Sequence, residues 1–159
     1  MLSRGDGPRS TRVGGCRPTL WLVKRAVFVR VNRALNAVVR RFGLSRFRGG
    51  DLLYLTTVGR KSGADRTTPA IYLRDGDSWV VAASNAGADW EPGWWLNLRS
   101  GSPAWVEVDG HRTAVSGSEI EEPERAEWWR RLNDVLDYDA YQRKVSRRIA
   151  VVRLSPKGQ

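Results

Sequence analysis

The chain has 159 residues, which is enough for one domain with a buried core and too few for two domains of ordinary size. Its 27 Lys and Arg residues outnumber its 17 Asp and Glu residues, and the formal net charge of +10 favours anionic partners such as phosphorylated cofactors, acidic lipids or nucleic acid. A single cysteine, Cys16, and a single histidine, His111, exclude an internal disulfide and a Cys/His metal site, so we expect no metal.

The first residues differ in composition from the rest of the chain. Residues 1–19 are rich in Gly, Arg, Ser and Pro and offer almost nothing to bury, which is typical of a flexible basic tail. They contain no apolar run of the kind found in secretory signals. No stretch of the chain approaches the ~18 consecutive apolar residues that span a bilayer. We therefore expect a cytoplasmic protein with a single domain over residues 20–157.

A basic helix is expected at the start of that domain. Between residues 20 and 43, Val and other apolar residues recur at intervals of three and four, with Arg and Lys between them. This spacing predicts an amphipathic helix with a basic face. Such a helix can cover the body of the domain or lie on a membrane surface. The two roles are compatible, so peripheral membrane association is one of our expectations.

The body of the chain shows the pattern of strands. Segments of strand-like composition, bounded by turn signals, cover residues 51–58, 69–74, 78–83, 104–108, 112–116 and 149–154. Asp75-Gly76 and Asp109-Gly110 are hairpin signals. Two expected helices, at 92–98 and 123–136, interrupt the strands, and each has Pro at its start. About six strands and few helices predict an α+β fold, a small antiparallel β-barrel with covering helices.

The most informative segment is the turn Gly59–Gly63 after the first of these strands. Exposed backbone N–H groups in such a turn, together with Arg60, Lys61 and the hydroxyl of Ser62, suit a phosphate or a carboxylate, and Arg66 follows closely. A solvated basic hairpin turn without a ligand has the same composition, so the segment alone leaves both interpretations open.

The spacing excludes the two common nucleotide-binding loops. A P-loop needs Gly-Lys-Ser/Thr leading into a helix, whereas Arg60 separates Gly59 from Lys61 and a strand follows. The chain also has no G-x-G-x-x-G turn between a strand and a helix. A cofactor with an anionic tail would therefore have to bind in another type of fold.

Six motifs stand in a fixed order along the chain: GRKSG, RTTP, AASNAG, PGWWLNL, YDAYQ and RRIAVV. In this order and at these separations, the chain resembles the deazaflavin-dependent nitroreductase family over about residues 20–155. The resemblance implies a split β-barrel, similar to FMN-binding barrels, and coenzyme F420 as the cofactor.

The resemblance also implies roles for individual residues. Arg60, Lys61 and Ser62 match the turn that grips the phosphate and acidic tail of the coenzyme, and Tyr138 matches a tyrosine beside the deazaflavin ring. A helix beginning near Pro92 would add the positive end of its dipole. The other implied cofactor contacts lie on a strand start, a strand end and a helix start: Arg66, Thr67, Thr68, Pro69, Ala82, Ala83, Ser84, Asn85, Gly93, Trp94, Trp95, Leu96 and Asn97.

These matches predict an oxidoreductase that transfers a hydride from reduced F420 to a conjugated hydrophobic acceptor, such as a quinone, an enone or a nitro compound. The expected substrate contacts are Ile71, Tyr138 and Tyr141. Ser84 or Tyr138 is the expected catalytic group, which donates a proton or orients the acceptor. The chain departs from the family at Asn85, where some members have Lys, and at residues 135–138, where a Tyr-Pro stretch and one aromatic residue are lost.

Other functions of a small barrel remain open at this point. FMN could replace F420, and a non-catalytic protein could bind haem, a fatty acid or the cofactor alone. A nucleic-acid partner is not expected, because the aromatic residues do not interleave with Arg and Lys as a single-strand platform requires. Split barrels often dimerise, so a homodimer is compatible with the predicted fold.

Overall fold

The computed structural model describes residues 26–27, 30–31, 34, 38 and 43–158. By its internal contacts the chain divides into Met1–Ala34 and Leu35–Gln159. The described residues between 26 and 38 are helical, in agreement with the expected basic helix. The remainder of that helix and the expected tail, residues 1–19, lie outside the described residues. Within the described part of the chain, no helix has the length and apolar character needed to cross a membrane.

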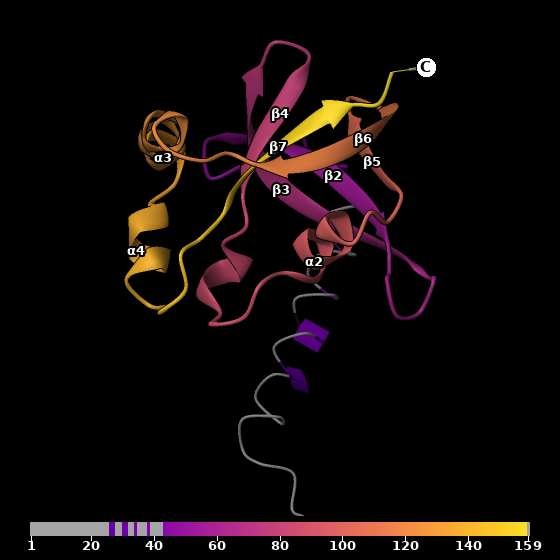
Figure 1. Ribbon diagram of the computed structural model, residues 1–159, viewed down its shortest axis with the longest axis horizontal. Coiled ribbons are helices and arrows are strands. Elements are labelled where there is room, and N and C mark those ends of the chain that lie inside the picture. Colours follow the sequence, from indigo (N-terminus) through magenta and orange to yellow (C-terminus); the bar gives the residue numbers. More distant parts are fainter. Residues whose placement is uncertain (1–25, 28–29, 32–33, 35–37, 39–42, 159) are drawn as a thin grey trace, which may run out of the picture. The chain divides into compact units, whose positions relative to one another are not determined.

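The second unit is built on a closed antiparallel barrel (Figure 1). Its strands are β1 (Arg46–Phe47), β2 (Gly50–Val58), β3 (Asp65–Asp75), β4 (Ser78–Ala82), β5 (Ala104–Val108), β6 (His111–Glu119) and β7 (Val151–Pro156). The hydrogen-bonded order is β1-β2-β3-β4-β7-β6-β5, and β5 pairs back onto β2. This pairing closes β2 to β7 into a six-stranded barrel, so the predicted fold class is confirmed.

The helices lie between the strands in sequence. They are the 3-10 turn η1 (Asn85–Gly87) and the helices α2 (Gly93–Arg99), α3 (Glu124–Val135) and α4 (Tyr138–Gln142). The prediction found α2 and α3 but not η1, α4 or the two-residue β1, and it made β3 and β6 too short. Polar residues at the ends of β3 and β6 hid these extensions, because the ladder continues there without the apolar alternation that marks a strand in the sequence.

Two buried layers hold the barrel together. Alternate residues of the strands face inward, as with Val81 and Val152, and they pack with Trp94, Trp95 and Leu98 of α2 inside the barrel. The strand residues between them face outward and pack against α3 and α4. This second cluster consists of Val80, Ile120, Trp128, Leu132, Tyr138 and Val151. Helix α2 therefore closes the barrel interior, while α3 covers its outer face.

Part of β3 has only one strand neighbour. Residues 65–71 pair with β2, and pairing with β4 begins at Tyr72. Within the described residues the other edge of this stretch is unpaired. Pro69 lies in it, and a proline is tolerated in a strand where an edge is free. The segment expected to line a cofactor groove is thus an accessible strand edge.

Candidate functional site

The hairpin turn between β2 and β3 is braced from within. The N–H of Gly59 donates to the carbonyl of Ala64 at 2.9 Å, and the N–H groups of Ser62 and Gly63 donate to the carbonyl of Gly59 at 3.1 and 2.7 Å. The hydroxyl of Ser62 accepts a bond from the N–H of Ala64 at 3.3 Å. A Cβ at position 59 would lie 2.7 Å from this hydroxyl, so a larger residue there would require the Ser62 side chain to turn away. The N–H groups of Gly59, Ser62 and Gly63 are thus already used within the turn, and contact of its backbone with an anion stays a prediction.

The cationic side chains of the same turn are available. Arg60, Lys61 and Arg66 are all exposed. None of the three has a carboxylate within ion-pair distance in the part of the chain that the structure describes. A group of exposed cations without partners suits a ligand that carries several negative charges. The turn therefore fits an anionic tail through its side chains.

Asn97 of α2 ties this turn to the barrel. Its Oδ1 accepts bonds from the backbone N–H of Arg60 at 3.2 Å and from Arg60 Nη1 at 3.3 Å. Its Nδ2 donates to Oγ1 of Thr57 at 3.0 Å. Asn97 is only 4% exposed, so these bonds are shielded from water. The resemblance implied a cofactor contact for Asn97, and the structure shows in addition that it orients Arg60.

The loop from β4 to α2 carries free backbone donors. Ser84 is in the right-handed helical region, with φ −71° and ψ −28°, whereas Asn85 and Ala86 are left-handed, with φ values of 49° and 51°. Residues in this right-left order turn successive N–H groups to one side, an arrangement that binds anions. The N–H groups of Ser84, Asn85 and Ala86 donate to no acceptor within the described residues. This loop therefore offers backbone donors that could bind an anion.

The side chain of Asn85 is directed to the chain that leads into α2. Its Nδ2 donates to the carbonyl of Trp90 at 2.9 Å. The neighbouring Ala83 is fully buried, and its N–H donates to the carbonyl of Ala150 at 2.9 Å. Ala82 and Ser84 are half-buried. The loop thus presents its backbone and Ser84 rather than the amide of Asn85.

Helix α2 contributes packing more than exposed surface. Trp94 and Trp95 are 8% and 2% exposed, and their rings lie 6.2 Å apart in the barrel core. The N–H groups of Trp95 and Leu96 both donate to the carbonyl of Pro92. The helix has seven residues, and these bonds use amides at the end where a positive dipole was expected. Gly93 is exposed at its start. Contact of either Trp with a cofactor ring stays a prediction.

The start of β3 extends the site along the strand. The hydroxyls of Thr67 and Thr56 lie 2.8 Å apart, in a hydrogen bond between β3 and β2. Thr68 and Pro69 follow, and both are half-buried. These three β3 residues lie on the stretch with the unpaired edge, beside the exposed Arg66.

The tyrosines lie under α3 and next to the loop. Tyr138 is 4% exposed, and its ring is 6.2 Å from that of Trp129 and 6.1 Å from that of Tyr141. Burial, and to a smaller degree Tyr141, raises the pKa of the Tyr138 phenol well above its ordinary range. A Cβ at Gly87 would lie 3.1 Å from the ring of Tyr141, which shows how closely α4 approaches η1.

The predicted substrate residue Ile71 lies elsewhere on the strand. It pairs with Leu52, at the end of the β2–β3 ladder farthest from the turn. It is 7% exposed and borders Gly50 together with Val135 of α3. In contrast, the turn, α2, η1 and α4 all lie toward one end of the barrel (Figure 1). The structure therefore brings the predicted cofactor residues and α4 toward that end, whereas Ile71 lies at the other end of the β2–β3 ladder.

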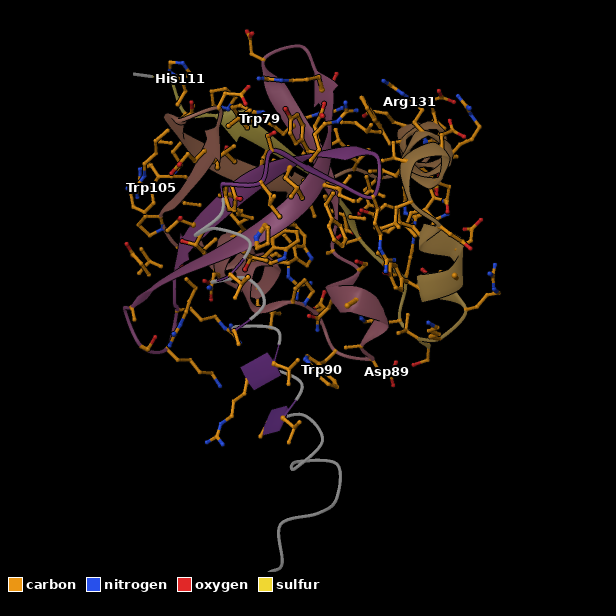
Figure 2. The ribbon with its side chains drawn as sticks, turned by 180° about the vertical axis from the view of Figure 1, so that it is seen from behind. Trp79, Asp89, Trp90, Trp105, His111 and Arg131 are labelled. Carbon is orange, nitrogen blue, oxygen red and sulfur yellow. The ribbon has the colours of Figure 1, made fainter. Side chains whose placement is uncertain are left out.

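A separate surface hollow shows no relation to this arrangement. Figure 2 shows Trp79 and His111 at the end of the barrel opposite Asp89 and Trp90, and the hollow lies at the former end. Its lining residues are Arg74, Asp77, Trp79, Val108, Asp109, His111, Thr113 and Pro156. None of them belongs to the predicted site. Among the described residues, no group of three or more His, Cys, Asp or Glu side chains could hold a metal ion.

Comparison with known proteins identifies the family. Residues 25–156 match the F420H(2)-dependent quinone reductase family. The chain belongs to this family. A relative in Mycobacterium tuberculosis (strain H37Rv), named as an F420H(2)-dependent quinone reductase, is 33% identical over 143 residues, which are 85% of this chain and 95% of the relative.

Two solved structures agree with the barrel. A structure named as an F420-H2 dependent reductase has 26% identity and a TM-score of 0.59, and the match covers 65% of this chain and 93% of that chain. A second structure, described as a domain-swapped dimer, has 24% identity and a TM-score of 0.60, over 84% and 99% of the two chains. The F420H(2)-dependent quinone reductase family confirms the predicted enzyme class, and its name contains the cofactor and one of the three acceptors that we expected.

Proposed function

We propose that this protein reduces a quinone with F420H2, using the end of the barrel formed by the β2–β3 turn, the loop after β4 and the segment around α4. The observation that carries the proposal is the group of exposed cations Arg60, Lys61 and Arg66, which have no ion-pair partner among the described residues. Family membership supplies the cofactor class and the acceptor class. The free N–H groups of Ser84, Asn85 and Ala86 support the same proposal, because the tail of F420 bears a phosphodiester and glutamates.

Different residues would bind different parts of the cofactor. Arg60, Lys61 and Arg66 would hold the acidic tail, and Asn97 keeps the Arg60 backbone and guanidinium in one direction. The loop N–H groups would face an anionic group nearer the ring. Thr67, Thr68 and Pro69 would line the groove along the free edge of β3. Because Arg60 is held by Asn97 before binding, its contact needs little ordering when the cofactor arrives.

Bound F420H2 supplies the hydride, and the protein supplies geometry and exclusion of water. A quinone that accepts a hydride also needs a proton to become a hydroquinone. The raised pKa of Tyr138 keeps its phenol protonated at neutral pH, so it is suited to donate a hydrogen bond to the acceptor oxygen and poorly suited to release its proton. Ser84 would orient the acceptor, and solvent would deliver the proton.

The test is a titration of the purified protein with F420, followed by quenching of tryptophan fluorescence. We expect wild-type binding in the micromolar range, and an increase in Kd of at least about tenfold in Arg60→Ala/Lys61→Ala. The control is Arg112→Ala/Lys157→Ala, which removes the same charge from exposed positions outside the site and should bind like the wild type. Saturation by FMN without binding of F420 would contradict the proposed cofactor, and equal binding by both double variants would contradict the role of the turn.

Two further expectations stay predictions. One is a homodimer, which light scattering would detect. A solved structure with this fold is described as a domain-swapped dimer. The other is a cytoplasmic location with contact between the basic helix and a membrane surface. Co-sedimentation with anionic vesicles at low and high salt tests that contact, because electrostatic binding to lipid weakens as salt is added.

A further inference from the structure

Arg147 reaches from the segment before β7 into the loop that follows β4. Its Nη2 donates to the carbonyls of Ala83 at 3.1 Å, Ser84 at 3.1 Å and Ala88 at 3.2 Å. Its Nε also donates to the carbonyl of Ala88, at 3.3 Å. One guanidinium therefore joins the beginning of the loop to its end, from a position 59 residues beyond Ala88 and 64 residues beyond Ala83 in the chain.

The loop conformation that Arg147 closes is an unusual one. Asn85, Ala86 and Gly87 have φ values of 49°, 51° and 77°, a run of left-handed residues of which only glycine adopts this region at no cost. Inside the loop, two bonds are made: Gly87 N–H to the carbonyl of Ser84 and Ala88 N–H to that of Asn85, each at 3.0 Å. Contacts from outside the loop must therefore help to maintain the conformation.

Arg147 is held without a carboxylate. No acidic side chain lies within ion-pair distance of it in the described part of the chain, and Asp89 instead accepts bonds from the N–H and hydroxyl of Ser146. The guanidinium is partly buried, and its Nη1 is buried with no acceptor. Burial lowers the pKa of the Arg147 guanidinium, and the charges of Glu91 and Asp89 act in the opposite direction. The direct partners of this charge in the described part of the chain are therefore the carbonyl oxygens of the loop.

We propose that Arg147 is a positioning residue for cofactor binding: its guanidinium holds residues 83–88 in the conformation that turns the free N–H groups of Ser84, Asn85 and Ala86 to one side. The inference rests on the proposed function, because it assumes that this side faces the anionic part of the cofactor. In this role Arg147 does not touch the cofactor. It acts through the backbone of the loop, and its charge adds to the positive potential there.

The planar guanidinium, with several N–H donors in fixed directions, is essential to this role. A lysine at 147 would keep the positive charge, but its single ammonium could not hold the carbonyls of Ala83, Ser84 and Ala88 in the same geometry. Arg147→Lys therefore removes the hydrogen-bond geometry of the guanidinium and keeps its positive charge. The neighbouring Arg148 provides a matched control, because it is exposed and pairs with Glu122 at 2.8 Å.

The first measurement is hydrogen exchange of the cofactor-free protein. We expect Arg147→Lys to accelerate exchange of the Gly87 and Ala88 amides by about tenfold, while amides of the β2–β3 ladder keep their wild-type rates. Arg148→Lys should leave both groups of amides unchanged. Wild-type exchange rates in the loop of Arg147→Lys would overturn the inference without reference to any ligand.

The second measurement is F420 binding by the same three proteins, together with the steady-state constants for F420H2. Arg147→Lys should raise Kd and KM for the cofactor by about tenfold and change kcat little, because the lost order is recovered once the cofactor is bound. A more mobile loop with unchanged Kd and KM would overturn the inference and leave the proposed function intact. Failure of the wild type to bind F420 would overturn the proposed function and the inference with it.

Discussion

The backbone N–H and the guanidinium of Arg60 both donate to one oxygen, Oδ1 of Asn97, which is 37 residues further along the chain. The arginine lies on the β2–β3 turn and the asparagine on α2. Asn97 in turn is held by Thr57, at 3.0 Å, inside the barrel. A buried amide therefore connects the barrel core to an exposed cation, and the direction of that cation depends on the packing of α2.

Replacement of Asn97 by alanine is predicted to loosen the turn and destabilise the fold. The change leaves the Arg60 N–H and the buried Thr57 hydroxyl without their partner, and such losses cost about 1–3 kcal/mol. We expect this decrease in the free energy of unfolding in urea, and faster exchange of the Arg60 amide.

Ser62→Ala provides the comparison, because the Ser62 hydroxyl is exposed and accepts one bond within the turn. It should change the free energy of unfolding by no more than about 0.5 kcal/mol, as is usual for surface substitutions. If Asn97→Ala were as stable as Ser62→Ala, the amide would not connect the turn to the barrel.

The contrast between the barrel and Asn97 shows what the sequence could predict. Asp75-Gly76 and Asp109-Gly110 mark the β3–β4 and β5–β6 hairpins, because short turns have strong local preferences. The bond between Asn97 and Arg60 joins distant segments, and no local pattern encodes it. The loop at Ser84 falls between these cases, since Asn and Gly favour left-handed backbone but the direction of the free N–H groups depends on the fold.

The short elements were missed for a related reason. Helix α4 has five residues, too few to show a helical period. Its available signal was Asp137, whose side chain accepts a bond from the N–H of Ala140 at 2.8 Å as an N-cap. Tyr138 and Tyr141 were located by resemblance alone, and the burial of Tyr138 under α3 could not be read from their spacing.

The outer face of the barrel is predicted to depend on Leu132. This residue of α3 is fully buried and packs in the cluster that contains Val80 and Val151. Leu132→Ala should lower the free energy of unfolding by about 2–5 kcal/mol, through lost burial and the cavity that remains. Leu136→Ala, at a half-buried position of the same cluster, should have a smaller effect in the same urea titration. Equal effects would show that α3 is not seated through Leu132.

Stability is predicted to fall in acid partly through Glu124. Hydrogen bonds from Arg153, first, and Trp128, second, lower the pKa of the Glu124 carboxyl below its ordinary 4.5. A lowered pKa in the folded state means that the carboxylate stabilises the fold above pH 4.5, and that this contribution is lost as the pH falls through the lower, folded-state pKa.

Glu124→Gln removes this proton-linked contribution. The variant should be less stable than the wild type at neutral pH, and the difference should shrink as the solution is acidified below pH 4.5. Melting temperatures across this range provide the measurement. Glu121→Gln is the matched control, because that carboxylate is exposed and its nearest ion-pair contact, Arg148, is 3.9 Å away. A constant difference between Glu124→Gln and the wild type would contradict the assignment.

The phenol of Tyr138 is predicted to ionise at a higher pH than an ordinary tyrosine. Burial disfavours the phenolate, so its pKa lies well above the ordinary 10.0. In an alkaline absorbance titration, Tyr138→Phe should remove a component that ionises well above pH 10.0. Tyr141→Phe should move that component toward lower pH, because Tyr141 also raises the pKa of Tyr138. Loss of a component near pH 10.0 in Tyr138→Phe would show instead that the phenol is solvated, and Tyr138 would then be able to release a proton to the acceptor.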